Sequence, residues 1–361
     1  MKYLLDHTYP NPLYLQLYEQ LRNDIIVGIY PYQTRLPSKR LLSEELGISV
    51  ITVEHAYTLL CDEGYIESKE RSGYFAAYRE SDNFSVVNQQ PTYKMITENS
   101  AELADDFPFS VLSKTMRRVL SDYREAILIK CPNNGCTELR NAIAQYLARS
   151  RGITVDAGQI IIGSGAEYLY GLIVQTLGRD RIYAIEKPSY EKIEMVYRAN
   201  GVSCDLLSFG PDGIQSDQLA RTQASVLHIT PYRSFPSGVT ASAAKRREYI
   251  RWADSADRFI VEDDFESEFT LSTKPEETVF SLAKKANVIY INTFSKTIAP
   301  SFRIGYMVLP KSLLELFDKQ IGFYSCTVPS FEQYVLAEFI QSGDFERHIN
   351  RIRRKKRKQI Q

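Results

Sequence analysis

Hydrophobic positions near the start of the chain recur every three or four residues, which is the spacing of one helical face. In residues 13–27, Leu17, Leu21 and Ile25 fall on one side of a predicted helix. Gly28 follows the last of these positions and is a suitable residue to end the helix. The pattern therefore predicts an amphipathic helix whose apolar side packs into a small core.

Two shorter helices are predicted next, separated by a tight turn. Ser38 and Ser49 are suitable N-cap residues, and Gly47 and Gly64 end the two helices. The side chains predicted to face inward from these helices are Leu41, Leu42, Leu46, Val53, Tyr57 and Leu60. Residues 65–77 then read as strand, turn and strand. Together these elements predict a helix-turn-helix followed by a β-wing.

The second helix of such a motif places its N-terminal residues in the major groove of DNA. We expect Thr52 and His55 to reach base edges or phosphates, and the basic residues to hold phosphates. The predicted DNA-binding residues are Ser38, Lys39, Arg40, Ser49, Thr52, His55, Lys69 and Arg71. From these residues alone, the alternative is a small helical domain that binds a protein or only packs.

A polar stretch of little periodicity, rich in Asn, Gln and Ser, occupies residues 79–106. It predicts a linker between an N-terminal domain, residues 1–78, and a larger domain, residues 107–361. The alternative for part of the stretch is a strand or an arm, because "FSVV" within it is apolar.

From about residue 107, short apolar runs rich in β-branched residues alternate with helical patterns. The predicted strands are "QIIIG", "RIYAIE", "SCDLLSF", "SVLHIT", "RFIVEDD" and "NVIYIN". Predicted helices include "EYLYGLIVQTLG" and residues 189–200, 242–257 and 277–287. This alternation predicts an α/β fold with a mostly parallel sheet and helices on both faces. Ligands of such sheets bind beyond the carboxyl ends of the strands.

Residues with useful chemistry stand at those strand ends. The turn Gly163–Ala166 joins a strand to a helix N-terminus, which suits a phosphate, although glycine turns after strands are common. Asp263 ends a strand and is a candidate partner for a protonated ring nitrogen, with a helix cap or a surface acid as the alternative. Lys296 follows another strand and is a candidate for a Schiff base, with an ordinary solvated charge as the alternative.

Three further residues lie close to Lys296 in the sequence and suit a phosphate: Thr293, Ser295 and Arg303. A phosphate turn, a carboxylate for a ring nitrogen, a lysine and a phosphate-binding arginine are together what pyridoxal 5′-phosphate (PLP) requires of a protein. The strand ends therefore predict a PLP site.

Composition and charge restrict the remaining possibilities. The chain has 44 Lys and Arg and 44 Asp and Glu, so no global field draws it to nucleic acid, and DNA binding has to come from a local patch. Its five cysteines are scattered and indicate neither a disulfide framework nor a zinc site, so we expect no metal and reduced thiols. Neither a signal peptide nor a membrane-spanning run is predicted, and we expect a cytoplasmic protein.

Residues 36–76 resemble the winged-helix head of GntR-type bacterial regulators along their whole length. Residues from about 107 to 358 resemble a fold-type-I aminotransferase domain. The segments that carry the second resemblance are "GCTELRNAIAQYL", "IIIGSGAEYLYGL", "EKPSY", "TPYRSFPSG", "VEDDFESEF" and "TFSKTIAPSFRIGYMVLP". A GntR head joined to such a domain is the architecture of MocR-type regulators.

The resemblance implies a role for each candidate in the large domain. Lys296 would carry PLP as a Schiff base, Asp263 would pair with the pyridine nitrogen, and Tyr190 would stack on the ring. The residues that would hold the phosphate are Gly165, Ala166, Ser295 and Arg303. For Tyr190 alone, the alternative is a core or surface aromatic, since the chain has 24 tyrosines.

The chain departs from the family pattern at four places. Val50 stands where an arginine usually follows the capping serine, and Phe265 stands where a tyrosine usually contacts the cofactor's 3-oxygen. Residues 232–234 are Tyr, Arg and Ser where Ser, His and Gln are usual. We also expect a shortened large domain that lacks the C-terminal lobe, which carries the arginine for a substrate's α-carboxylate.

The resemblance implies a homodimeric, PLP-binding and DNA-binding transcription regulator. Its aminotransferase-like domain would sense an amine, an amino acid or the cofactor itself through Schiff-base chemistry, with at most half-transamination. One alternative is an aminotransferase with real turnover, which Phe265 and the expected lack of the C-terminal lobe both disfavour. The other is a truncated remnant that only binds DNA.

Overall fold

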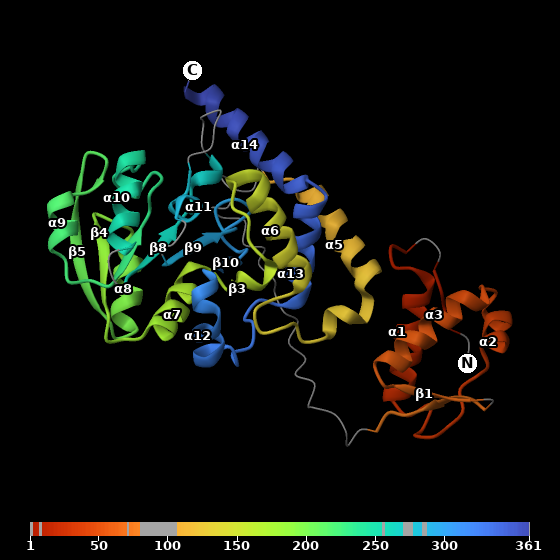
Figure 1. The fold of residues 1–361 in the computed structure, drawn as a ribbon. Helices are drawn as coiled ribbons and strands as arrows, with labels where there is room; N and C mark the ends of the chain where they lie inside the picture. Colours follow the sequence, from red (N-terminus) through yellow and green to blue (C-terminus); the bar gives the residue numbers. More distant parts are fainter. Residues whose placement is uncertain are drawn as a thin grey trace. The chain divides into compact units, whose positions relative to one another are not determined.

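The computed structural model describes residues 3–6, 9–70, 72–79, 107–254, 257–269, 277–283 and 287–360. The chain forms two compact units, Met1–Ile96 and Thr97–Gln361, which are described separately below (Figure 1). Residues 80–106, with most of the predicted linker and its possible strand, lie outside the described residues, as does the predicted DNA contact Arg71.

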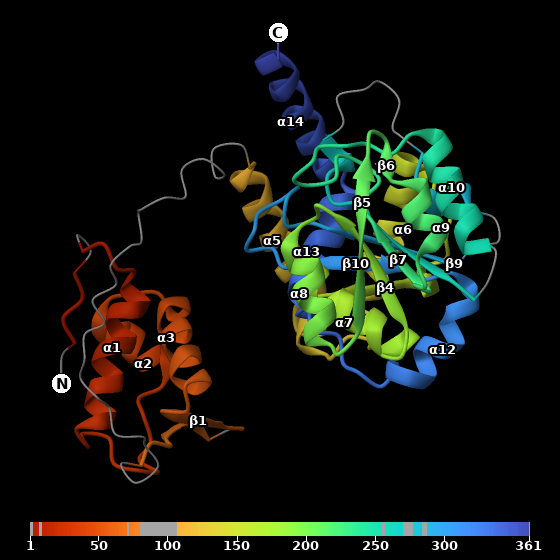
Figure 2. The same cartoon turned by 90° about the vertical axis from the view of Figure 1, so that its left-hand side faces the viewer.

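The first unit is a helix-turn-helix with a two-stranded wing. Its elements are α1 (Leu13–Ile26), α2 (Lys39–Leu46), α3 (Val50–Asp62), β1 (Ile66–Lys69) and β2 (Gly73–Ala76), with the two strands antiparallel (Figure 2). The predicted caps are present, because Ser38 Oγ accepts from Leu41 N and Ser49 Oγ accepts from Thr52 N. These bonds satisfy N–H groups that have no partner within the helix, and they set where α2 and α3 begin.

The core of this unit is formed by the predicted helix faces, with one exception. The side chains buried between the three helices are Leu17, Leu21, Ile25, Leu42, Val53, Tyr57 and Leu60. Leu41 was predicted to face inward, and that prediction is wrong, because Leu41 is 47% exposed. A helix of eight residues presents only about two turns to a core, and Leu42 occupies the inward position.

The second unit is built on one eight-stranded sheet in the order β3-β10-β9-β8-β7-β4-β5-β6. The strands are β3 (Ile160–Gly163), β4 (Ile182–Lys187), β5 (Ser203–Gly210), β6 (Gly213–Ile214), β7 (Val226–Ile229), β8 (Phe259–Asp263), β9 (Asn287–Thr293) and β10 (Gly305–Val308). The five strands β9, β8, β7, β4 and β5, which are neighbours in this order, are parallel to one another. Strand β10 runs antiparallel to β3 and β9, and β6 runs antiparallel to β5. The predicted α/β fold with a mostly parallel sheet is confirmed.

Helices cover both faces of this sheet. They are α5 (Phe109–Tyr123), α6 (Thr137–Arg151), α7 (Ala166–Leu177), α8 (Glu191–Ala199), α9 (Ser216–Arg221), α10 (Ala243–Asp254), α11 (Val279–Leu282), α12 (Lys311–Ile321), α13 (Ser330–Gln341) and α14 (Asp344–Ile360). Short 3-10 turns are η2 (Arg124–Leu128), η3 (Ala157–Gln159) and η4 (Ser267–Phe269). In Figure 1, α7, α8 and α12 lie below the sheet and α6 and α10 above it.

The two-residue period of the strands explains this layering. Ile160 and Ile162 of β3 pack with α6 and α13, whereas Ile161 between them packs with α7 and α12. Tyr290 and Ile291 of β9 divide between the two cores in the same way. Because successive side chains of a strand point to opposite faces, a continuous apolar run requires cover on both sides.

Of the helix predicted over residues 277–287, the structure confirms residues 279–282, and the prediction is wrong at residues 277, 278, 283 and 287. In the described part of this segment the helix is α11, which Thr278 caps through its side chain, and the backbone is already extended at Ala283. Residues 284–286 lie outside the described residues, and β9 begins at Asn287. The buried Glu262 carboxylate accepts from Val279 N and Phe280 N, which satisfies the N–H groups at the start of this short helix.

Among the helices that the structure describes, none is long and apolar enough to cross a bilayer.

Candidate functional site

A cavity of about 300 Å³ lies where the carboxyl ends of β3, β8 and β9 meet the N-terminal ends of α7 and α8. It is lined by Gly165, Ala166, Glu167, Tyr170, Tyr190, Ile193, Phe235, Asp263, Phe265, Thr293, Ser295, Lys296 and Arg303. All eight residues predicted to contact the cofactor are in this set. The fold therefore brings together side chains from segments far apart in the chain, and their contact with a cofactor stays a prediction.

One wall of the cavity is the turn before α7, with a guanidinium held over it. Gly165 has a φ of 97°, which favours glycine, and a Cβ there would lie 3.3 Å from an Arg303 nitrogen. Arg303 donates to Glu167 across 3.0 Å, and Glu167 also accepts from Lys192 across 3.1 Å. Ser295 Oγ donates to the carbonyl oxygen of Phe302 across 3.1 Å. A helix N-terminus beside an arginine and a hydroxyl is suited to a phosphate group.

The opposite wall carries Asp263 at the end of β8, where the carboxylate is 3% exposed. Burial raises the pKa of Asp263 to about 6, and a hydrogen bond from the Tyr170 hydroxyl to Oδ2 opposes that rise. His228 Nε2 lies 3.9 Å from the same oxygen, and Tyr197 OH lies 2.8 Å from His228 Nδ1. Since burial lowers the pKa of His228 to about 3, its imidazole is neutral at neutral pH and adds no charge beside Asp263.

Lys296 lies in the turn between β9 and β10. Its Nζ is 2.7 Å from Glu266 Oε1 and 4.1 Å from the centre of the Phe265 ring. The side chain is 45% exposed, so the amine lies at the mouth of the cavity, within reach of a molecule that enters it. Phe265 contributes an apolar ring to the cavity and has no hydroxyl, in contrast to the tyrosine that usually stands at this position of the family pattern.

Two aromatic rings complete the cavity. Tyr190 is the N-cap residue of α8, and its ring contacts Phe235 edge to face at 6.3 Å. Tyr190 is among the exposed large side chains, and it lines the cavity and takes no part in a packed core. A planar heterocycle inside the cavity would therefore have a tyrosine ring available for stacking.

The residues present fit PLP on two observations of this structure. Asp263 Oδ1 is buried and has no hydrogen-bond partner among the described residues, whereas Oδ2 has one. A buried acceptor of this kind calls for a donor such as a protonated ring nitrogen. At the other end, the close approach of Gly165 and Arg303 forms a cradle that any side chain at Gly165 would fill. The two ends are joined by a cavity that also contains Lys296.

Sequence reasoning missed several residues of this site: Glu167, Tyr170, Ile193, His228, Phe235 and Glu266. A signal existed for Tyr170, which lies four residues after Ala166 and hence on the same helical face. No local pattern pointed to Glu167 and Glu266, because their partners Arg303 and Lys296 are distant in the sequence.

We expect Tyr170→Phe to weaken PLP binding about tenfold near neutral pH, the effect of one charge-assisted hydrogen bond. Loss of the Tyr170 hydroxyl removes a donor that lowers the pKa of Asp263, so a larger fraction of Asp263 would be protonated. Absorbance titration with PLP at pH 6 and pH 8 measures the effect, which should be larger at pH 6. Tyr197→Phe, which removes the bond to His228 and leaves Asp263 Oδ2 its donor, is the control. Equal affinity of Tyr170→Phe and wild type at both pH values would contradict the assignment.

Buried acids make the large unit sensitive to pH. Burial raises the pKa of Glu186, at the end of β4, and of Glu262, in β8, to about 8 each. The folded chain therefore binds more protons than the unfolded chain between about pH 4.5 and 8, so stability is highest below this window and falls as pH rises through it. Each tenfold difference in proton affinity contributes about 1.4 kcal/mol.

We therefore expect Tm to decrease between pH 5 and pH 8.5, and Glu186→Gln to reduce that decrease by about 5 °C. The carboxamide oxygen at position 186 still accepts from Ser234 Oγ, which donates across 2.8 Å in the wild type. Thermal unfolding followed by circular dichroism over this range is the measurement. A variant whose Tm decreases as steeply as that of the wild type would show that Glu186 is ionised in the folded state.

In the first unit, the N-terminal end of α3 presents both polar and apolar side chains to solvent. Ser49 Oγ lies 2.9 Å from Thr52 Oγ1 and accepts from Thr52 N, so both side chains take part in the cap. Val50 and Ile51 are among the exposed large hydrophobic residues. Exposed apolar side chains at this end of a recognition helix are suited to contact with thymine methyl groups.

The other predicted DNA contacts differ in their surroundings. Lys39 Nζ lies 2.5 Å from Glu54, and Lys69 Nζ lies 2.8 Å from Glu67, so each ammonium has a carboxylate partner that DNA would have to displace. His55 packs edge to face against Tyr14 at 5.7 Å. The exposed residues among the predicted contacts include Ser38, Ser49 and Arg40. All of these assignments stay predictions.

Comparison with known protein families covers both units. The aminotransferase class I and II family matches residues 104–361, and the gntR family of bacterial regulatory proteins matches residues 13–75. The fold and the cofactor implied by the first match agree with the cavity described above, since aminotransferases of this class use PLP.

Relatives match both parts together. The chain is 34% identical over 366 residues to YdeL, an uncharacterised HTH-type transcriptional regulator of Bacillus subtilis strain 168, and the match covers 98% of this chain and 79% of YdeL. It is 29% identical over 375 residues to the probable rhizopine catabolism regulatory protein MocR of Rhizobium meliloti, covering 97% and 76%.

Among solved structures, the chain is similar to the kynurenine aminotransferase of Pyrococcus horikoshii, which was solved in complex with PMP. The TM-score is 0.63 and the identity 26%, over 69% of this chain and 64% of that chain. The chain thus spans just under two thirds of the length of that aminotransferase.

Proposed function

The chain belongs to the transcriptional regulators that join a gntR-family DNA-binding domain to an aminotransferase class I and II domain, and from this membership we propose that it regulates transcription in response to a small amine or amino acid. The observation that supports the proposal is the gathering of Lys296, Asp263, Arg303 and Tyr190 in one cavity on a chain that also carries a winged helix-turn-helix. Because DNA is its partner, we infer that it acts in the cytoplasm.

Different residues of the cavity would bind different parts of the cofactor. Arg303, Ser295 and the turn at Gly165 would hold the phosphate, Asp263 would hold the ring nitrogen, and Tyr190 would cover one face of the ring. When bound, PLP withdraws electrons from an amine joined to it. In the structure, Glu266 holds the Lys296 ammonium at the cavity mouth. Transfer of a proton from Lys296 to Glu266 or to water would leave the amine neutral and nucleophilic.

An effector changes operator affinity only if it binds two states of the regulator unequally. An amine that competes for the position of Lys296 would separate this side chain from Glu266, which lies beside β8. We propose this change of partner at Lys296 as the local event that the effector causes. A homodimer would present two DNA-binding heads to paired half-sites.

The proposal is tested with DNA selected from a random duplex library by the full-length chain loaded with PLP. Fluorescence anisotropy then gives the Kd for the selected duplex with PLP alone and with each of a panel of amino acids and amines. At least one amine should change Kd fivefold or more, the lower end of ordinary allosteric coupling, and Lys296→Ala should not respond. A Kd unaffected by PLP and by every amine would refute sensing, while DNA selection itself would still report on the first unit.

An aminotransferase with turnover is the second candidate, and the cavity with Lys296 is the observation in its favour. Phe265 provides no hydroxyl that could donate a hydrogen bond to the cofactor's 3-oxygen, which disfavours efficient turnover. Steady-state conversion of an amino donor and a keto acid by the purified chain, absent in Lys296→Ala, would establish this activity. Product limited to one equivalent per chain would instead agree with a regulator.

A further inference from the structure

Two loops of the large unit lie against each other and bring cysteines together. The first loop, residues 129–136, joins η2 to α6, and the second, residues 322–329, joins α12 to α13. Ser330 Oγ donates to the carbonyl oxygen of Ile129 across 3.1 Å, and Asn133 Nδ2 donates to that of Gly322 across 2.9 Å. These two hydrogen bonds hold the loops together, and the loops run antiparallel to each other.

Cys131 and Cys326 stand between these two ties. Gln333 Nε2 lies 3.4 Å from Cys131 Sγ and 3.5 Å from Cys326 Sγ, so one amide nitrogen contacts both sulfurs. Gln333 is fully buried, and its other contacts keep it in place: Nε2 donates to Val328 O across 2.8 Å, and Oε1 accepts from Cys136 N across 2.7 Å. The amide is held from both ends, and it positions the two thiols next to each other.

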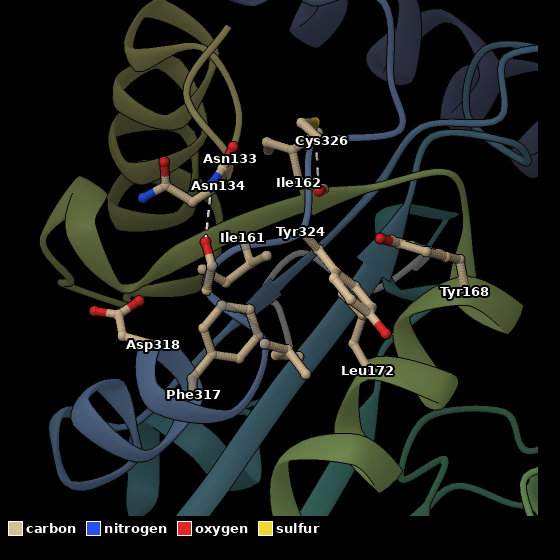
Figure 3. Close-up of a pocket in the computed structure, with 12 residues that line it drawn as sticks. Asn133, Asn134, Ile161, Ile162, Tyr168, Leu172, Phe317, Asp318, Tyr324 and Cys326 are labelled. Carbon is tan, nitrogen blue, oxygen red and sulfur yellow. Dashed lines mark hydrogen bonds between the residues drawn. The ribbon is translucent and has the colours of Figure 1, made fainter.

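The two thiols are reachable from solvent, unlike the third cysteine of this region. Cys131 and Cys326 are half-buried, whereas Cys136 is 1% exposed. Cys326 also lines a cavity of about 210 Å³ together with Tyr324 and Tyr168 (Figure 3). A small oxidant would therefore reach Cys131 from the loop surface and Cys326 from this cavity.

We propose that Cys131 and Cys326 are a redox-modifiable pair that a peroxide converts into a disulfide. In the first step, Cys131 Sγ attacks a peroxide oxygen, and with hydrogen peroxide this forms a sulfenic acid and one water. In the second, Cys326 Sγ loses its proton, attacks the Cys131 sulfur and expels a second water. Two thiols and one hydrogen peroxide thus become one disulfide and two waters.

The roles of the two thiols follow from their surroundings. Burial raises the pKa of Cys326 to about 11, and the neighbouring Cys131 adds to the rise, so Cys326 is protonated at neutral pH and is not the thiol that attacks the peroxide first. Burial likewise raises the pKa of Cys136 to about 12, which disfavours its reaction. Metal binding does not explain the cluster, since the described residues contain no group of three or more His, Cys, Asp and Glu arranged to hold a metal ion.

The cross-link would act on the strand that leads to the phosphate turn. Cys326 Sγ donates to the carbonyl oxygen of Ile162 across 3.7 Å, a contact drawn as a dashed line in Figure 3. Ile162 N donates to Asn134 O of the first loop across 3.1 Å. Ile162 precedes Gly163, the last residue of β3. A disulfide would therefore join both loops beside Ile162 of β3, directly before the glycine turn Gly163–Ala166 of the cofactor cavity.

The test uses the full-length chain, reduced and then treated with hydrogen peroxide at neutral pH. Remaining thiols are alkylated, and a non-reducing digest is analysed by mass spectrometry. We expect a peptide linked through Cys131 and Cys326 that dithiothreitol separates, and its loss in Cys131→Ser and in Cys326→Ser. Cys204→Ser, a half-buried cysteine of β5 outside the cluster, is the matched control and should retain the link.

Two results would overturn the proposal. One is oxidation without any linked peptide, and the other is a link from Cys131 to Cys136 in place of Cys326. A parallel sample oxidised in urea shows whether the folded loops cause the pairing, and there the link should fall at least fivefold. Circular dichroism of each reduced variant establishes that it is folded before oxidation.

Discussion

Lys296→Ala is expected to abolish covalent attachment of PLP. Among the described residues that line the cavity, the one lysine is Lys296. Its Nζ lies 2.7 Å from Glu266 Oε1, which holds it at the mouth of the cavity. Wild type incubated with PLP and reduced with sodium borohydride should gain the mass of one reduced cofactor per chain. The variant should gain none, and the visible absorbance band that bound PLP gives the wild type should be absent.

Lys192→Ala is the matched control for this prediction. Lys192 is close to the cavity, with Nζ 3.1 Å from Glu167 and 6.0 Å from the centre of the Tyr190 ring, but it does not line the cavity. A borohydride-reduced Lys192→Ala should therefore carry the cofactor at Lys296, as peptide mapping would show. If the label moved to another lysine in Lys296→Ala with unchanged stoichiometry, the assignment of Lys296 would be wrong.

Ile51→Glu is expected to weaken binding to the selected duplex at least about 30-fold, the effect of about 2 kcal/mol. Ile51 is in the first turn of α3 and is 64% exposed, so the replacement removes no core contact. A carboxylate also suits a helix N-terminus, so we expect little change in stability. In the major groove, however, the same carboxylate would replace an apolar contact and face the charge of the phosphates.

Leu4→Glu controls for added negative charge on the first unit. Leu4 is 83% exposed and lies beside α1, where its backbone N–H donates to Gln20 across 3.1 Å. Its Kd should stay within about twofold of wild type at equal salt, since surface substitutions away from the contact have small effects. Fluorescence anisotropy at two salt concentrations measures both variants. Unchanged affinity of Ile51→Glu would mean that α3 does not enter the groove by this end.

Most of the fold was predictable because its determinants are local. Ser38 and Ser49 cap the helices that they were predicted to begin, and the apolar runs of the large unit are the strands of a mostly parallel sheet. The errors occurred where local signals were weak. Leu41 is adjacent to Leu42 on a helix of eight residues, and the segment after Thr278 contains too little chain before β9 for the predicted helix.

The candidate site shows the same division between local and distant information. Lys296, Asp263 and the turn at Gly165 were identified because each follows a strand, and parallel strands end at one edge of a sheet. Tyr170, the hydrogen-bond partner of Asp263, was not identified from the sequence, because the two residues are 93 positions apart. Nor did spacing show that Lys39 is engaged with Glu54.

By itself, the sequence determined where helices and strands begin, which faces are apolar and which reactive residues stand at strand ends. These properties depend on backbone hydrogen bonds and on side-chain periods of two and 3.6 residues, which act over a few positions. The tertiary structure alone decided which charges and thiols meet, as at Arg303 and Glu167 or at Cys131 and Cys326. Such contacts depend on how sheet order and loop packing bring together segments more than 100 residues apart, and no short-range pattern encodes that distance.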